Sequence, residues 1–222
     1  MTPDAFHSDF WEGMDRANAT VYRHQLVQKW LSKMPSVTDK LNAGGRGVDV
    51  GCGQGNAVVV LAEHFPNSKF VGFDPHRPSI EKARQAARFA RVADRTTFIV
   101  GSAEDLPAGE VDLATSFLSV HHMSDPIRDL SAIRRALRSA GSYLIREDNL
   151  SNQLEEHTTP SARLAYSSSA LACLHDSMAK DGAALGPLPE ARITRLAKQA
   201  GFSQFRRLPI KSAYDAVYEA KN

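Results

Sequence analysis

Apolar positions along the middle of the chain follow two alternating patterns. Short continuous apolar runs predict buried strands, and segments with an apolar residue at every third or fourth position predict amphipathic helices. The strands expected from these patterns are residues 47–51, 69–74, 96–101, 111–118 and 142–147, and the helices between them are 56–65, 78–93 and 125–141. Strands that alternate with helices indicate an α/β fold with a parallel sheet and right-handed crossovers.

The helix predicted at 125–141 has one apolar face. The residues expected on that face are Ile127, Leu130, Ile133 and Leu137. Gly141 follows them, and a glycine just after the last periodic residue is typical of a helix C-terminus. We therefore expect this helix to run as far as Gly141.

Helical patterns also occur at both ends of the chain. In residues 1–40, apolar side chains recur at every fourth position, at Phe6, Phe10 and Met14 and again at Tyr22, Leu26 and Trp30. Residues 161–180 have an apolar stripe of Leu164, Leu171, Leu174 and Met178, which predicts an inserted helix. A last helix is expected at 188–202, ended by Gly201, and residues 203–210 and 215–221 are interpreted as closing strands.

Composition and charge are ordinary for a globular protein. The 222 residues fit one domain with additions, and the net charge of +2 gives no strong attraction to nucleic acid or membrane. The two cysteines form neither a metal-type motif nor a disulfide framework. No apolar run reaches transmembrane length, and the first residues lack the pattern of a secretory signal. We therefore expect a cytoplasmic protein.

Three glycines follow the first predicted strand in "VDVGCGQGN". Gly51, Gly53 and Gly55 spell G-x-G-x-G, whereas the dinucleotide-binding fingerprint is G-x-G-x-x-G, and Asn56 stands where its third glycine would begin the helix. Asp74 ends the second strand, where a carboxylate accepts hydrogen bonds from the ribose hydroxyls of an adenosine ligand. The spacing favours an adenosine ligand without a pyrophosphate over a bare strand-to-helix turn.

Several motifs in order extend this interpretation. "VDVGCGQGN", "FVGFDP", "VGSAEDLP", "VDLATSFLSVHHMSDP" and "LRSAGSYLIRED" resemble class I S-adenosylmethionine-dependent methyltransferases over residues 44–148, and the downstream part resembles a small-molecule subgroup. The resemblance implies a doubly wound, mostly parallel seven-stranded Rossmann-like sheet. Residues 1–43 would be a helical lid segment, and residues 44–222 the S-adenosylmethionine-binding domain, with a helical insertion at 149–188.

The resemblance also implies cofactor contacts. Asp49 and the turn of Gly51, Gly53 and Gly55 would hold the methionine part, and Asp74 the ribose. Ser102 stands where relatives have an aspartate that receives the adenine amino group, so Ala103 and Glu104 are expected to compensate. Phe117 would lie against the cofactor.

Methyl transfer from a sulfonium needs mainly alignment of the reacting atoms and exclusion of water. A general base can also contribute, and His121 and His122 follow the fourth strand, where the acceptor should approach. We favour His121; the alternative is that both histidines are structural. Asp125 is nearby, but no third ligand is suitably spaced, so no metal site is predicted.

Polar and aromatic residues elsewhere are candidates for substrate contacts. Arg146, Glu147 and Asp148 emerge together at the end of the fifth strand, where Arg146 is a candidate substrate contact and Glu147 a candidate catalytic residue. Glu147 or Asp148 either positions a polar substrate or forms an ion pair with a solvated helix end. The helical segments at the two ends of the chain are expected to cover the cofactor edge and to contribute Trp11, Tyr22, Tyr166 and His175, although such stripes also occur in cores.

The sequence thus predicts an S-adenosylmethionine-dependent methyltransferase that acts on oxygen, nitrogen or another heteroatom of a small organic molecule. The alternatives are a nicotinamide-dependent oxidoreductase and a non-catalytic S-adenosylmethionine-binding regulatory protein. Basic residues between Lys82 and Arg95 are interpreted as a solvated helix face rather than an RNA-binding surface. No nucleic-acid or membrane partner is predicted, and the oligomeric state stays open.

Overall fold

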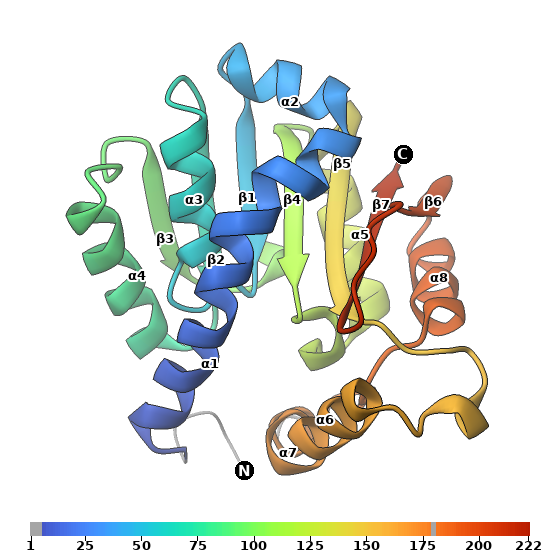
Figure 1. Cartoon of the computed structure of the whole chain (residues 1–222). Helices are drawn as coiled ribbons and strands as arrows, with labels where there is room; N and C mark the ends of the chain where they lie inside the picture. The colour runs from blue at the N-terminus through green and yellow to red at the C-terminus, as the bar shows by residue number, and fades with distance from the viewer. Residues whose placement is uncertain (1–5, 179–180) are drawn as a thin grey trace.

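One seven-stranded sheet forms the centre of the computed structural model, which describes residues 6–178 and 181–222 (Figure 1). The strands lie in the order β3-β2-β1-β4-β5-β7-β6, and only β7 runs antiparallel to its neighbours. Their bounds are β1 (Arg46–Val50), β2 (Lys69–Asp74), β3 (Thr96–Val100), β4 (Val111–Phe117), β5 (Leu137–Asp148), β6 (Gln204–Arg207) and β7 (Asp215–Lys221).

Helices cover both faces of this sheet. One hydrophobic cluster joins α2 (Pro35–Asn42), α3 (Asn56–His64) and α4 (Arg77–Phe89) to the sheet. A second cluster joins α5 (Pro126–Ala136) and α8 (Glu190–Gln199) to the sheet's other face. Because alternating strands and helices bury both faces of a parallel sheet, the predicted doubly wound α/β fold is confirmed.

The N-terminal segment is helical, as predicted, but its two halves pack differently. It consists of α1 (Ser8–Val21), a π-helix η2 (Tyr22–Trp30) and a 3₁₀ turn η3 (Leu31–Lys33), while residues 1–5 lie outside the described part. No residue of α1 is buried, whereas Tyr22, Leu26 and Trp30 belong to the first hydrophobic cluster. The η2 half of this segment is therefore part of the core, and α1 lies at the edge of the core.

The prediction that a helix extends to Gly141 is wrong. Helix α5 ends at Ala136, and Leu137 already pairs with Val111 at the start of β5. Gly141 lies inside this strand, where a side chain would meet the Val111 carbonyl oxygen at 2.7 Å. The glycine thus permits close approach of two strands at a register shift rather than ending a helix.

The inserted segment is helical as predicted, but a different face of it is buried. It comprises α6 (Pro160–Ser168), a π-helix η7 (Ser169–Cys173) and α7 (Leu174–Met178); the predicted residues 179–180 lie outside the described part. Leu164, Leu171 and Met178 are 58–70% exposed, whereas the small residues Ala162, Ala165 and Ala172 are buried. Periodicity identified the helix, but the face that packs is the one whose small side chains allow close approach.

Figure 1 places α6, α7 and the first turns of α1 at the end of the sheet where the parallel strands finish. The 3₁₀ turns η4 (Ala103–Asp105), after β3, and η5 (Val120–His122), after β4, lie at the same end; a further turn, η6 (Leu154–Glu156), precedes α6. Open α/β sheets bind their ligands at this end. Within the described residues, no helix combines the length and hydrophobicity needed to cross a membrane.

Candidate functional site

The glycine turn between β1 and α3 is fixed by Asp74 at the end of β2. Oδ2 of Asp74 accepts a hydrogen bond from the Gly53 N–H, and Oδ1 accepts one from the His76 N–H, both at 2.9 Å. Gly53 has φ +52°, and a side chain there would project into open space. Each carboxylate oxygen keeps a further lone pair, so Asp74 can still accept hydrogen bonds from a ligand beside the turn.

A cavity of about 490 Å³ lies against this turn. Such a volume falls in the usual range of small-molecule sites. Its wall comes from the glycine turn, the ends of β2 and β4, α1, α5 and the inserted helices. The lining residues that the sequence singled out are Gly51, Gly53, Asp74, Ser102, Ala103, Phe117, His122, Trp11 and Tyr22.

The other predicted cofactor residues lie behind this wall. Gly55 packs against Phe98 at the start of α3. Asp49 is 3% exposed and accepts a hydrogen bond from the Thr115 hydroxyl at 2.7 Å. Burial raises the pKa of Asp49 to about 7, and the negative charge of Asp74 adds to the effect. Burial also raises the pKa of Asp74 itself.

On the adenine side that the sequence predicted, η4 and α5 form the wall. Ser102 and Ala103 line the cavity, but Glu104 does not; its carboxylate pairs with Arg128 at 3.1 Å. The neighbouring Asp129 does line the cavity, and it is 8% exposed. A carboxylate with no sequence motif to mark it therefore lines the same cavity as Ser102.

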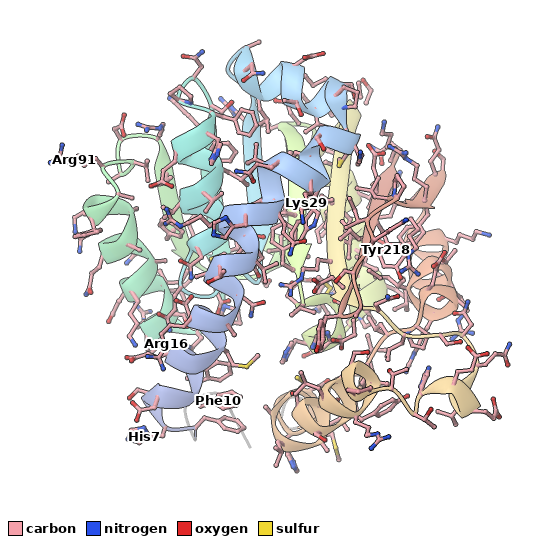
Figure 2. The ribbon with its side chains drawn as sticks, viewed as in Figure 1. His7, Phe10, Arg16, Lys29, Arg91 and Tyr218 are labelled. Carbon is pink, nitrogen blue, oxygen red and sulfur yellow. The ribbon has the colours of Figure 1, made fainter. Side chains whose placement is uncertain are left out.

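Helix α1 supplies one side of the cavity through Phe10, Trp11, Met14, Asp15 and Asn18, of which the sequence proposed only Trp11 as a site residue. Figure 2 shows the side chains along this helix, with Phe10 near its beginning and Arg16 in its middle. Side-chain contacts tie it to the rest of the chain: Asn56 to Asp15, Lys82 to Glu12 at 2.6 Å, and Arg146 to Asn18 at 2.7 Å.

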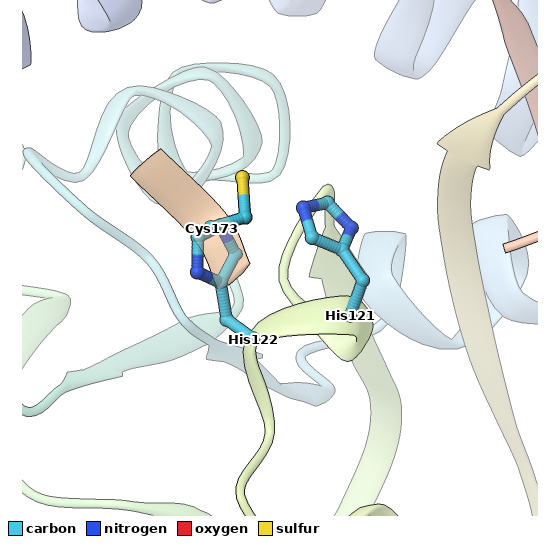
Figure 3. A group of neighbouring side chains, drawn as sticks. All are labelled: His121, His122 and Cys173. Atoms are coloured by element: carbon cyan, nitrogen blue, oxygen red, sulfur yellow. The ribbon is translucent and has the colours of Figure 1, made fainter. Parts of the chain in front are cut away.

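A cluster of nucleophilic side chains lies at the end of β4. His121 Nδ1 is 2.6 Å from Glu147 Oε2, and the other carboxylate oxygen accepts a hydrogen bond from the Val120 N–H. The ring centroids of His121 and His122 are 4.5 Å apart. Cys173 comes from η7 in the insertion, and one ligand atom from each histidine and its sulfur all lie within 4.8 Å of one another (Figure 3).

Only part of this cluster faces the cavity. His122 and Cys173 line it, whereas His121 is 6% exposed and Glu147 is fully buried behind it. Burial would lower the pKa of His121, but the Glu147 charge and hydrogen bonds with Cys173 and Glu147 together raise that pKa well above its usual value. Burial would raise the pKa of Cys173, but hydrogen bonding with both histidines lowers it to about 6.

The remaining predicted substrate residues do not line the cavity. Arg146 is buried, pairs with Asp215 at 2.7 Å and lies over the Tyr22 ring. Tyr166 bonds His157 instead, and His175 is exposed. Glu147 forms a hydrogen bond with His121 and does not line the cavity. On α4, Lys82 donates a hydrogen bond to Glu12, and Arg84 donates one to the Phe98 carbonyl oxygen.

This chain is similar in sequence to known methyltransferases. A family model described as a methyltransferase domain matches residues 41–201. A ubiquinone/menaquinone biosynthesis C-methyltransferase of Geobacter sp. strain M21 is 32% identical over 110 residues, which are 48% of this chain and 47% of that protein. The chain spans no more than about half the length of the curated relatives that it matches.

Solved structures show the same fold. An O-methyltransferase family protein from Burkholderia thailandensis has a TM-score of 0.68 at 14% identity, covering 96% of this chain and 58% of that one. A geranyl diphosphate methyltransferase in complex with S-adenosylmethionine has a TM-score of 0.59 at 15% identity, covering 84% of each chain. Because the family model spans most of the chain, this chain belongs to the class I S-adenosylmethionine-dependent methyltransferases, and solved methyltransferases share its fold.

Proposed function

We propose that this chain transfers the methyl group of S-adenosylmethionine to a small organic molecule held in the same cavity. The observation that carries the proposal is the continuity of that cavity. It runs from the glycine turn and Asp74, which fit the cofactor, to the aromatic wall of α1 and the inserted η7. When bound, the cofactor supplies an activated methyl group; the chain has to align the acceptor and exclude water.

The residues around the turn fit the cofactor. Gly53 leaves open space where any larger residue would place a side chain. Asp74 retains acceptor capacity for ribose hydroxyls. We assign the adenine amino group to Asp129, because it lines the same cavity as Ser102 and, unlike serine, offers a charged acceptor.

Helix α1 and the insertion enclose the acceptor side. Trp11 and Tyr22 offer aromatic surface, and Leu171 and Ala172 of η7 line the same cavity. This lining supports an acceptor with an apolar or aromatic body. The acceptor atom stays open, since the relatives include proteins named for C- and O-methylation. The division into a lid segment and a domain, the base role of His121 and a cytoplasmic location remain predictions.

Calorimetry with S-adenosylhomocysteine and with NAD tests the cofactor part of the proposal. We expect S-adenosylhomocysteine to bind and to raise the melting temperature, and NAD to do neither. NAD binding alone would instead favour the nicotinamide-dependent oxidoreductase. S-adenosylhomocysteine binding without methyl turnover on any acceptor would favour the regulatory protein.

A further inference from the structure

We propose that His121, His122 and Cys173 form a binding site for a zinc ion beside the methyl-transfer cavity. The sequence suggested no such site, because the third ligand is not near the histidines in the chain. The fold supplies it by placing η7 of the insertion over η5. The proposal does not depend on the proposed function, since a metal ion can bind whether or not methyl transfer occurs.

The donor set suits zinc. Imidazole nitrogens and thiolates are both usual zinc ligands, and a site with three protein ligands keeps one position open. His122 and Cys173 line the cavity, whereas His121 is buried behind them. The open position would therefore face the cavity, where a fourth ligand from a small molecule or water can reach it.

Glu147 lies behind the ligands and orients the His121 ring. Its carboxylate holds Nδ1 of His121 at 2.6 Å, which leaves Nε2 as the nitrogen available for an ion. Histidine ligands in metal sites commonly bond a carboxylate through their other nitrogen, because this fixes the ring orientation and the tautomer. Figure 3 shows a ring nitrogen of His121 turned toward the sulfur of Cys173.

The distances require only a small contraction. Zinc–nitrogen bonds of about 2.0–2.1 Å and zinc–sulfur bonds of about 2.3 Å place tetrahedral ligand atoms about 3.3–3.6 Å apart. In this structure the three ligand atoms lie within 4.8 Å of one another. Cys173 is the last residue of a π-helix, a type of turn that is frequent at functional sites.

A bound ion has a direct consequence for His121. Its Nε2 cannot both coordinate zinc and remove a proton from a methyl acceptor. Zinc binding would thus replace the base role predicted for this residue.

Titration of the untagged, metal-stripped protein with Co²⁺ tests the proposal. Co²⁺ replaces zinc in such sites and reports a thiolate ligand through a sulfur-to-metal absorption band. We expect one equivalent to produce that band and zinc to abolish it by displacement. Cys173→Ser should lose the band, and His122→Gln should bind Co²⁺ more weakly. Cys52→Ser removes the other cysteine and should keep the band.

The buried carboxylate provides a second readout. Glu147→Gln should weaken metal affinity about 10- to 100-fold while the thiolate band persists. If that variant fails to fold, as judged by circular dichroism, Cys173→Ser and His122→Gln still decide the matter, since both residues lie at the cavity wall. The proposal is overturned if no thiolate band appears, or if the band survives Cys173→Ser. S-adenosylhomocysteine binding, measured separately, shows whether the cofactor site is intact.

Discussion

The carboxylate of Asp74 accepts a hydrogen bond from the backbone N–H of Gly53 at 2.9 Å. This contact joins the end of β2 to the turn that follows β1, so the carboxylate and the open side of Gly53 face the same cavity. One acidic residue thereby shapes the turn and presents acceptor oxygens beside it. Both roles follow from the parallel pairing of adjacent strands, whose ends meet at one edge of the sheet.

Asp74→Ala is expected to weaken S-adenosylhomocysteine binding about 10- to 150-fold. This range corresponds to about 1.5–3 kcal/mol, the usual worth of hydrogen bonds to a charged group. Isothermal titration calorimetry measures it, with Asp94→Ala as the control, since Asp94 is a largely exposed aspartate. Unchanged affinity in Asp74→Ala would remove this residue from the cofactor site.

Gly53→Val is expected to abolish cofactor binding, because its side chain would occupy the space beside the turn. Gly109 is the matched control: it also has a positive φ, +68°, and open space around it, but it does not line the cavity. Gly109→Val should cost similar stability through backbone strain and retain S-adenosylhomocysteine binding. If Gly53→Val binds S-adenosylhomocysteine as tightly as Gly109→Val does, Gly53 does not face the ligand.

Asp129→Ala should change the preference between cofactor analogues. If Asp129 accepts the adenine amino group, the native protein prefers S-adenosylhomocysteine over its inosine analogue, which has an oxygen at that position. Asp129→Ala should lose most of this preference, and Ser102→Ala should keep it. Competition binding with the two analogues measures the ratio; an unaltered ratio in Asp129→Ala would contradict the assignment.

The charge of Asp49 should make stability depend on pH. Its pKa is about 7 in the folded protein and about 3.9 when unfolded, so the neutral form is favoured by folding. Its stabilising contribution is present below pH 4 and is lost as the pH rises through 7. The difference corresponds to at most about 4 kcal/mol. The charge of Asp74 raises the pKa of this carboxylate further, whereas the hydrogen bond from the Thr115 hydroxyl lowers it.

Urea unfolding of the native protein and of Asp49→Asn between pH 5 and 8 isolates this effect. The free energy of unfolding of the variant, relative to the native protein, should rise with pH, because asparagine cannot acquire the buried charge. Other titrating groups cancel in the difference. A constant difference across this range would show that Asp49 does not change ionisation there.

The covering role of α1 can be tested at its contact with α3. Asp15→Ala removes the bond to Asn56, next to the glycine turn. We expect S-adenosylhomocysteine affinity to fall about 2- to 12-fold, because binding must then also order this wall, at about 0.5–1.5 kcal/mol per side chain. Arg16→Ala, at an exposed neighbour, should have no effect. Identical affinities in the two variants would argue against the contact. Deleting residues 1–30 would not isolate the role of α1, because it would also remove the core residues Tyr22, Leu26 and Trp30.

The sequence predicted the sheet, and it singled out the glycine turn and Asp74 that line the cavity, because both depend on local patterns. The short apolar runs identified the strands. The number of residues between the glycine turn and Asp74 is set by the helix and strand between them, so the sequence alone reveals it. The end of α5 was missed, because Gly141 has the same identity whether it ends a helix or lets β5 approach Val111. Only the sheet register distinguishes these cases.

Contacts between distant segments could not be predicted in this way. Cys173 meets His121 and His122 only after the insertion folds over η5, and no local motif signals that contact. Likewise, the helical period in α1 did not indicate that Asp15 and Asn18 would face the cavity. The apolar stripe of the insertion even suggested the wrong face, since exposure of Leu171 depends on what packs against the alanines.

We infer that one cavity holds both the methyl donor and its small-molecule acceptor. The most direct test of this inference is transfer of a labelled methyl group from S-adenosylmethionine into a fractionated small-molecule extract. We expect the native protein and Gly109→Val to label a small organic compound, which mass spectrometry can identify, and Gly53→Val to label none. Absence of enzyme-dependent labelling in every fraction, or equal labelling by Gly53→Val, would contradict the account.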